Sequence, residues 1–155
     1  MFVRYSIVIK SKHWPRRLLK IKKIIKIIAR YKEILSYNAK LKYYCNIVLT
    51  NDFLIKKLNK TYKKQNISTD VLTFVSKIKK NSVIEKHCDI IISAETLFKD
   101  ARLNKKNFYD HFTHLIIHSI LHINGYSHNK NNDSYTMKNK EIEILNKIGI
   151  PNPYI

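Results

Sequence analysis

The sequence has 155 residues, which is enough for one domain with its own core and too few for two domains of ordinary size. Its hydrophobic content of 45% excludes a chain that is disordered throughout. Lys and Arg number 30 against 11 Asp and Glu, a formal charge of +19, so an acidic partner is expected, nucleic acid first, although the Lys- and Ile-rich composition is also typical of AT-rich coding sequences.

The first third of the chain predicts two strands and two helices. Residues 2–9 (F-V-R-Y-S-I-V-I) and 46–50 (N-I-V-L-T) are rich in β-branched residues, which is typical of strands. From Pro15 to about Leu35, apolar residues recur every three, four or seven positions with Lys and Arg between them. This pattern favours a helix that faces the core over a basic helix on a membrane surface. Asn51 or Asp52 can cap a second helix.

The rest of the chain predicts two strands and three helices. Residues 71–75 (V-L-T-F-V) form one strand, and 89–92 (D-I-I-I) are so apolar that they predict a central strand covered on both faces. The segment Lys77–Lys86 between them is expected to be an exposed connection. Three helices follow, over 94–103, 110–124 and 134–148. No linker or repeat interrupts the chain, so we expect residues 1–155 to form a single compact α+β domain, with a roughly four-stranded mixed sheet packed by about five helices.

Cysteine spacing and hydropathy bear on the cellular compartment. Cys45 and Cys88 lie far apart without C-x-x-C spacing, which favours two small buried side chains over a disulfide or a cysteine zinc site. The first ten residues lack the apolar run of a signal peptide, and no segment approaches the roughly 18 apolar residues of a membrane span. We therefore expect a cytoplasmic protein with no membrane partner.

Five of the seven histidines fall between residues 111 and 128. On a helix, His118 and His122 lie one turn apart on the same face, close enough to bind one ion. Gly125 can end the helix and let the chain turn back, so that His128 becomes a third ligand. Three neutral imidazoles with one open position are the usual catalytic zinc arrangement. The alternative is an amphipathic helix whose histidines are exposed by accident.

The remaining histidines and one serine refine this hypothesis. We assign His111 and His114 to packing or to contact with the ligands from behind, because a third ligand in line along the helix would lie too far from the ion. His13 and His87 have no context that favours a site. A zinc peptidase of the H-E-x-x-H type needs a glutamate at the position of Ser119. Peptidase activity is therefore the weakest of the functional hypotheses for this site.

Further segments fit together with the histidine triad in one known pattern. Residues 118–128 read H-S-I-L-H-I-N-G-Y-S-H, which resembles the H-G-x-L-H-L-x-G-Y-D-H pattern of the YbeY family of endoribonucleases. Four other matches occur in the right order: L-N-K-T-Y-K at 58–63, T-D-V-L-T-F at 69–74, C-D-I at 88–90, and Met137, Glu141, Leu145 and Gly149 at the family's M-x3-E-x3-L-x3-G spacing. The resemblance covers most of the chain.

The resemblance implies a zinc-dependent, single-strand-specific endoribonuclease whose metal-site helix is like that of the zincins. It implies a role in ribosomal RNA processing, in late maturation of the 16S rRNA 3′ end and in ribosome quality control, with ribosomal RNA and the small ribosomal subunit as partners. His118, His122 and His128 would bind one zinc ion per chain. Lys63 would stand for the family's functional arginine, as a catalytic and substrate-binding residue.

The chain departs from the family pattern at several positions, and His111 stands near where the family usually has a glutamate. Lys63 keeps the positive charge of the arginine but loses its planar fork, which suits a phosphate. Ser119 replaces a glycine on the metal helix, and Ser127 replaces the aspartate before the last ligand. These changes leave a second hypothesis open, a basic RNA-binding ribosome assembly factor in which zinc is mainly structural.

Other residues that match the family have ordinary structural interpretations. We expect Met137 and Glu141 to be a core pair or to contact the ligands from behind. Asn59 and Asp70 are expected to hydrogen-bond the backbone near element ends. Tyr126 is expected either to pack beside the turn or to stack on a base.

Overall fold

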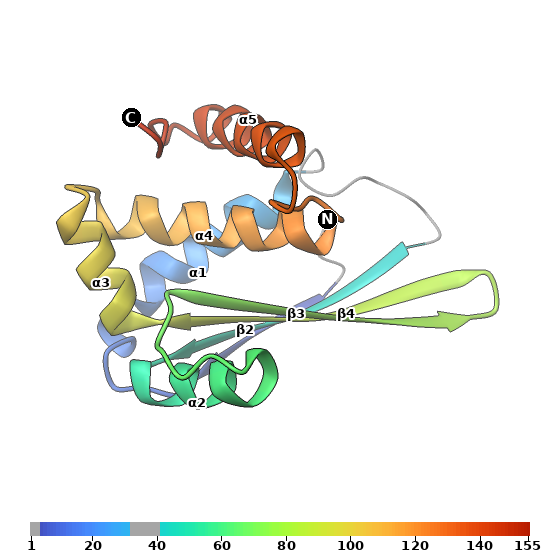
Figure 1. The fold of residues 1–155 in the computed structure, drawn as a ribbon, viewed down its shortest axis with the longest axis horizontal. Coiled ribbons are helices and arrows are strands. Elements are labelled where there is room, and N and C mark those ends of the chain that lie inside the picture. The colour runs from blue at the N-terminus through green and yellow to red at the C-terminus, as the bar shows by residue number, and fades with distance from the viewer. Residues whose placement is uncertain (1–3, 32–40) are drawn as a thin grey trace.

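The computed structural model describes residues 4–31 and 41–155. Within these residues the chain forms four strands, five α-helices and one 3-10 helix (Figure 1). In chain order they are β1 (Arg4–Ile9), the 3-10 helix Pro15–Arg17, α1 (Leu18–Arg30), β2 (Leu41–Thr50), α2 (Asp52–Lys63), β3 (Val71–Lys80), β4 (Val83–Ser93), α3 (Ala94–Leu103), α4 (Phe108–Ile123) and α5 (Asn131–Lys147). None of these helices is long and apolar enough to span a membrane.

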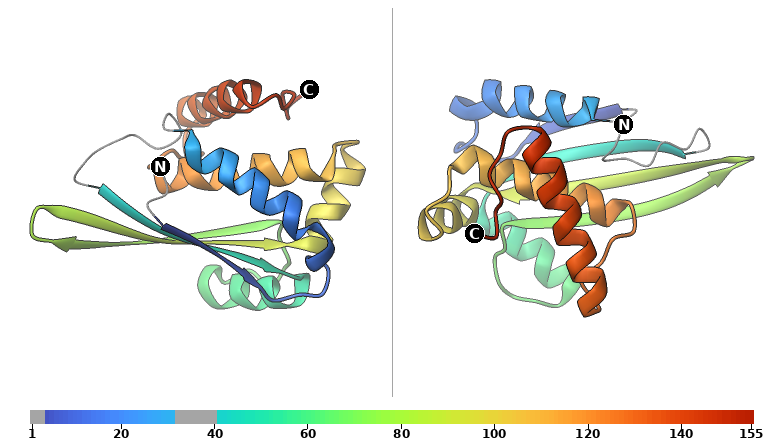
Figure 2. Two further views of the ribbon diagram at one scale, coloured as in Figure 1. Left: turned by 180° about the vertical axis from the view of Figure 1, so that it is seen from behind. Right: turned by 90° about the horizontal axis from the view of Figure 1, so that it is seen from above.

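The strands form one mixed sheet in the order β1-β2-β4-β3, in which β3 alone runs antiparallel to its neighbour. Helix α2 covers one face, whereas α1 and α4 cover the other and α5 lies over α4 (Figures 1 and 2). Ile90 and Ile92 of β4 point into the main core, and Ile91 packs with Ile55 of α2 and Leu72 of β3. The α+β class, the mixed sheet and the central position of 89–92 are therefore confirmed.

The predicted exposed connection Lys77–Lys86 is wrong. Strands β3 and β4 continue through this segment and form a hairpin that extends beyond the helices, with Lys80 paired to Val83 across a two-residue turn (Figure 1). Asn81 adopts φ +56° in this turn, a left-handed conformation that asparagine tolerates well. Backbone hydrogen bonds hold the two strands together, while their mostly exposed, Lys-rich side chains do not form an alternating apolar pattern in the sequence.

Two other predicted elements have different bounds in the structure. Helix α1 ends at Arg30, because Tyr31 adopts an extended conformation and its hydroxyl donates to the Lys147 carbonyl of α5. Leu35, the predicted end, lies outside the described residues. The strand predicted over 46–50 begins earlier, at Leu41, because β4 continues beside it. The three C-terminal helices match their predicted ranges to within one turn.

Helix α4 is held at both ends. At its N-terminus the Asn107 side chain accepts hydrogen bonds from the backbone of Tyr109 and Asp110, an N-cap. At its C-terminus the buried Lys86 ammonium of β4 donates to the Ile123 carbonyl at 2.9 Å. A cation at the C-terminus of a helix also interacts favourably with the helix dipole. The sheet and neighbouring helices thus fix the segment that carries the histidines.

A pair of matched substitutions tests this arrangement of the sheet. Ile90→Ala removes a fully buried side chain from the central strand and should lower the free energy of unfolding by about 2–5 kcal/mol. Ile78→Ala makes the same change on the hairpin, where the side chain is 44% exposed, and should stay within about 0.5 kcal/mol of wild type. Urea unfolding can be followed by the fluorescence of Trp14, the single tryptophan. Equal losses would contradict the assignment of strand interior and exposed hairpin.

Candidate metal centre

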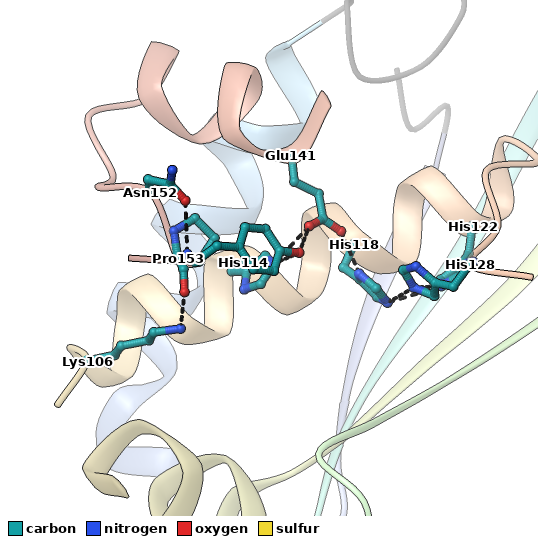
Figure 3. Close-up of polar contacts among 9 residues, drawn as sticks. Lys106, His114, His118, His122, His128, Glu141, Asn152 and Pro153 are labelled. Atoms are coloured by element: carbon teal, nitrogen blue, oxygen red, sulfur yellow. Dashed lines mark hydrogen bonds and ion pairs between the residues drawn. The ribbon is translucent and has the colours of Figure 1, made fainter. Parts of the chain in front are cut away.

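Three histidine side chains converge where α4 ends (Figure 3). His118 and His122 lie one turn apart on α4, and His128 returns from the loop that follows. Gly125 makes this return possible with φ +96°, which L side chains rarely adopt. The three Nε2 atoms lie 3.0, 3.1 and 3.2 Å from one another. The structure therefore brings together the three histidines that the sequence analysis predicts as metal ligands.

The opposite ring nitrogens show which tautomer two of these histidines adopt. His118 Nδ1 lies 2.5 Å from Glu141 Oε1, and His122 Nδ1 lies 2.9 Å from the Tyr126 carbonyl oxygen. A carboxylate and a carbonyl only accept hydrogen bonds, so both Nδ1 atoms carry the proton. The lone pairs therefore lie on Nε2 and face one another, an arrangement that a cation stabilises.

The spacing of the nitrogens suits zinc. Zn–N bonds of about 2.0–2.1 Å imply N···N edges of about 3.3–3.4 Å in a tetrahedral site, close to the distances observed. Burial, followed by repulsion from His118, lowers the pKa of both His122 and His128, which favours the neutral form of the ring that a metal requires. The donor set and its geometry thus fit one zinc ion with an open coordination position.

Glu141 of α5 is the buried partner that orients His118. Its carboxylate is fully buried and also pairs with His114 Nε2 at 3.2 Å, and it accepts a hydrogen bond from the Tyr154 hydroxyl. Burial opposes ionisation, but the hydrogen bonds from His114, His118 and Tyr154 outweigh it and lower the pKa of Glu141 to about 2. Burial and the Glu141 carboxylate raise the pKa of Tyr154, which therefore stays a hydrogen-bond donor.

The C-terminal segment that carries Tyr154 is itself tied to the start of α4. Lys106, just before α4, donates to the Pro153 carbonyl (Figure 3). The Asn152 side chain accepts from the Tyr154 backbone at 2.9 Å. The sequence gives no signal for the contact between Tyr154 and Glu141, because Tyr154 follows the last helix in a P-N-P-Y segment without periodicity.

Lys63 shares a pocket with the histidines. A cavity of about 310 Å³ is lined by Lys63 of α2, by His118 and His122 of α4, and by Val71, Thr73 and Val75 of β3. Helices α2 and α4 lie on opposite faces of the sheet, so these side chains meet around its β3 edge (Figure 1). Thr73 adds a polar wall that the sequence analysis did not single out.

Several other residues named in the sequence analysis have structural roles or lie outside the triad. Asn59 is buried and its Nδ2 donates to the Ile67 carbonyl, and Asp70 accepts from the Val71 backbone, as expected for backbone hydrogen bonding. Met137 lies in the core. Tyr126 packs against this core, and its carbonyl accepts a hydrogen bond from His122 Nδ1. Cys45 and Cys88 are free and buried. His13 and His87 lie outside the triad, near Glu95 and Tyr44 respectively.

The two serines that depart from the family pattern are accommodated differently. Ser119 is fully buried on α4, and its hydroxyl has no hydrogen-bond partner within the described residues. Ser127 donates to Asp133 of α5 at 3.3 Å. This contact anchors the loop directly before His128.

Comparison with known proteins shows the family of this chain. The family model described as Endoribonuclease YbeY matches residues 9–149. Curated relatives named Endoribonuclease YbeY include one from Ruthia magnifica subsp. Calyptogena magnifica, 41% identical over 108 residues (70% of this chain, 74% of the relative), and one from Ehrlichia chaffeensis, 32% identical over 154 residues (97% and 90%). The solution structure of TM1509 from Thermotoga maritima has a TM-score of 0.55 at 22% identity, covering 92% of this chain and 90% of that one, which shows a shared fold.

The fold and the site define an α+β protein with a three-histidine candidate metal centre on a buried helix. Because the family model spans residues 9–149 and a relative 32% identical is matched over 97% of the chain, this protein belongs to the YbeY endoribonuclease family.

The hydrogen bonds of Glu141 predict an acid-dependent contribution to stability. Folding lowers the pKa of the Glu141 carboxyl from 4.5 to about 2. The ionised carboxylate therefore stabilises the folded state above pH 4.5, and that stabilisation is lost as the pH falls toward 2. Glu141→Gln in the metal-free protein should therefore lose about 1–3 kcal/mol at pH 7, and the difference from wild type should shrink below pH 4.5. Urea unfolding at pH 7, 5 and 3 measures this.

Glu143→Gln is the matched control, because Glu143 lies exposed on the same helix and pairs with Lys140 and Lys147. It should leave stability nearly unchanged. A loss for Glu141→Gln that is equally large at pH 7 and pH 3 would mean that packing, rather than the charged hydrogen bonds, is responsible.

Proposed function

We propose that this protein is a zinc-dependent, single-strand-specific endoribonuclease that processes ribosomal RNA, in late maturation of the 16S rRNA 3′ end and in ribosome quality control. Its partners are ribosomal RNA and the small ribosomal subunit, and its location is the cytoplasm. The observation that carries the proposal is a triad of convergent Nε2 atoms, two of whose histidines, His118 and His122, line one pocket together with Lys63. Membership of the YbeY family supports the endoribonuclease reaction.

The proposed metal ligands are His118, His122 and His128, with one ion per chain. A zinc ion held by three neutral imidazoles supplies a Lewis acid and lowers the pKa of a bound water to about 7. A structural zinc site is normally closed by four protein ligands, so a triad with an open side favours catalysis over the assembly-factor alternative.

The chain's own residues orient and complete the site. Glu141 and the Tyr126 carbonyl fix the rings of His118 and His122 so that both Nε2 lone pairs point to one place. Lys63 provides the cation in the pocket, where it can bind a phosphate oxygen and stabilise the negative charge that develops during cleavage.

Charge and pocket size support a single RNA strand as substrate. The formal charge of +19 favours a polyanion and attracts it over long range. A pocket of about 310 Å³ is at the lower end for ligand sites, which suits one phosphodiester linkage with its neighbouring groups.

His122→Ala tests the metal nuclease directly. The variant should lose zinc and cleave a labelled single-stranded 16S rRNA fragment at least about 100-fold more slowly, because metal activation of water is lost, while its affinity for the RNA is retained. His87→Ala, which removes a half-exposed histidine outside the pocket, should bind zinc and cleave like wild type. Chelator should stop wild-type cleavage and added zinc should restore it. Tight RNA binding and stoichiometric zinc without cleavage would favour the assembly factor instead.

Lys63 variants test the role of the cation separately from the metal. Lys63→Ala should lower the cleavage rate about 100-fold with zinc content unchanged, because a charge-stabilising group is removed. Lys63→Arg should retain or increase the rate, because the planar guanidinium binds phosphate through two hydrogen bonds. Lys60→Ala, an exposed change on the same helix, is the control for net charge. Wild-type cleavage by Lys63→Ala would exclude Lys63 from the reaction.

A further inference from the structure

A second group of ligand-type side chains lies outside the triad. Asp70 directly precedes β3, Asp100 lies on α3, and His111 lies in the first turn of α4. Each offers a ligand atom, and these atoms all lie within 4.8 Å of one another. Three elements that are separate in sequence thus present two carboxylates and an imidazole to one point.

His111 is the residue that needs a partner. It is only 9% exposed, and neither of its ring nitrogens has a hydrogen-bond partner within the described residues. Burial lowers the pKa of His111 to about 4, so the ring is neutral and one nitrogen carries a lone pair. Buried polar groups are nearly always paired, so an unpartnered imidazole nitrogen within 4.8 Å of two carboxylate oxygens is a candidate cation ligand.

Among the described residues the two carboxylates also lack an ion-pair partner, despite the chain's formal charge of +19. Within residues 4–31 and 41–155, no Lys or Arg forms an ion pair with Asp70 or Asp100. Asp70 uses Oδ1 to accept from the Val71 backbone and the Thr69 hydroxyl, which leaves Oδ2. Burial and then the neighbouring Asp70 raise the pKa of Asp100, so a bound cation would relieve an unfavourable charge.

We propose that Asp70, Asp100 and His111 bind one divalent transition-metal ion, Mn²⁺ or Zn²⁺, at a second site separate from the histidine triad. Two carboxylate oxygens with one imidazole suit these ions, whereas Mg²⁺ and Ca²⁺ prefer oxygen ligands throughout. The site does not depend on the activity proposed above.

An ion at this site would join α3 to β3 and α4, two elements that line the triad pocket. Asp70 lies next to Val71, the first β3 residue that lines the pocket, and His111 lies on the helix that carries His118 and His122. The bound ion would therefore fix β3 and α3 against the N-terminal half of α4. Its role is to position the pocket wall, and the side chains that hold it do not reach the reacting atoms.

Metal stoichiometry in a protein without the triad tests the site. The full chain with His122→Ala and His128→Ala, stripped of metal, is titrated with Mn²⁺ and, separately, Zn²⁺ by calorimetry, and bound Mn²⁺ is confirmed by electron paramagnetic resonance. We expect one ion per chain and a higher melting temperature with the ion bound. Adding His111→Gln or Asp100→Asn should weaken the affinity at least about tenfold, because a direct ligand is removed.

Glu143→Gln in the same background removes one exposed carboxylate on α5 and should leave the affinity unchanged. Circular dichroism shows whether each variant folds. Asp100→Asn changes a side chain that is only half-buried, so it can replace His111→Gln in the test if that variant does not fold. The proposal is overturned if the triad-free chain binds neither ion, or if binding is the same with and without Asp100. Because the readout is bound metal, its failure is distinct from a failure to cleave RNA.

Discussion

The burial of α4 on nearly every side is the constraint on which the rest of this structure depends. Ten of its 16 residues are buried, with the sheet, α1, α3 and α5 as neighbours, so the helix can neither rotate nor shift without opening the core. The histidine side chains of α4 are therefore accessible only where no neighbouring element packs against the helix. The N-cap of Asn107 and the bond from Lys86 to the Ile123 carbonyl fix its two ends. A metal centre gains from this rigidity, because ligand atoms must be held within tenths of an ångström.

Several of the few carboxylates of this cationic chain lie beside histidines. Glu141 is fully buried, and its charge is stabilised by two histidines and a tyrosine rather than by Lys or Arg. This choice keeps the carboxylate available to orient His118, whereas a lysine partner would compete for it. Asp70 and Asp100 lie with His111, their ligand atoms within 4.8 Å of one another. Most of the positive charge thus remains on the outside, where it can attract a polyanion.

Much of the fold could be predicted from local patterns. The range of α3 was predicted correctly, and the central strand at 89–92 follows from its continuous apolar residues, because burial on both faces selects such side chains directly. The hairpin through Lys77–Lys86 could not be predicted, because its strands are held by backbone pairing while most of their side chains are exposed. The early end of α1 likewise depends on a contact between Tyr31 and α5, which is distant in sequence.

For the site, the sequence by itself determined the triad. His118, His122, Gly125 and His128 lie within 11 residues, and helical spacing plus one turn brings them together. Only the tertiary structure decided what surrounds them. Lys63 reaches the same pocket around the β3 edge, and Glu141 and Tyr154 arrive from the C-terminal segment. Contacts of this kind join residues far apart in the chain, and their position depends on how whole elements pack rather than on any local pattern of residues.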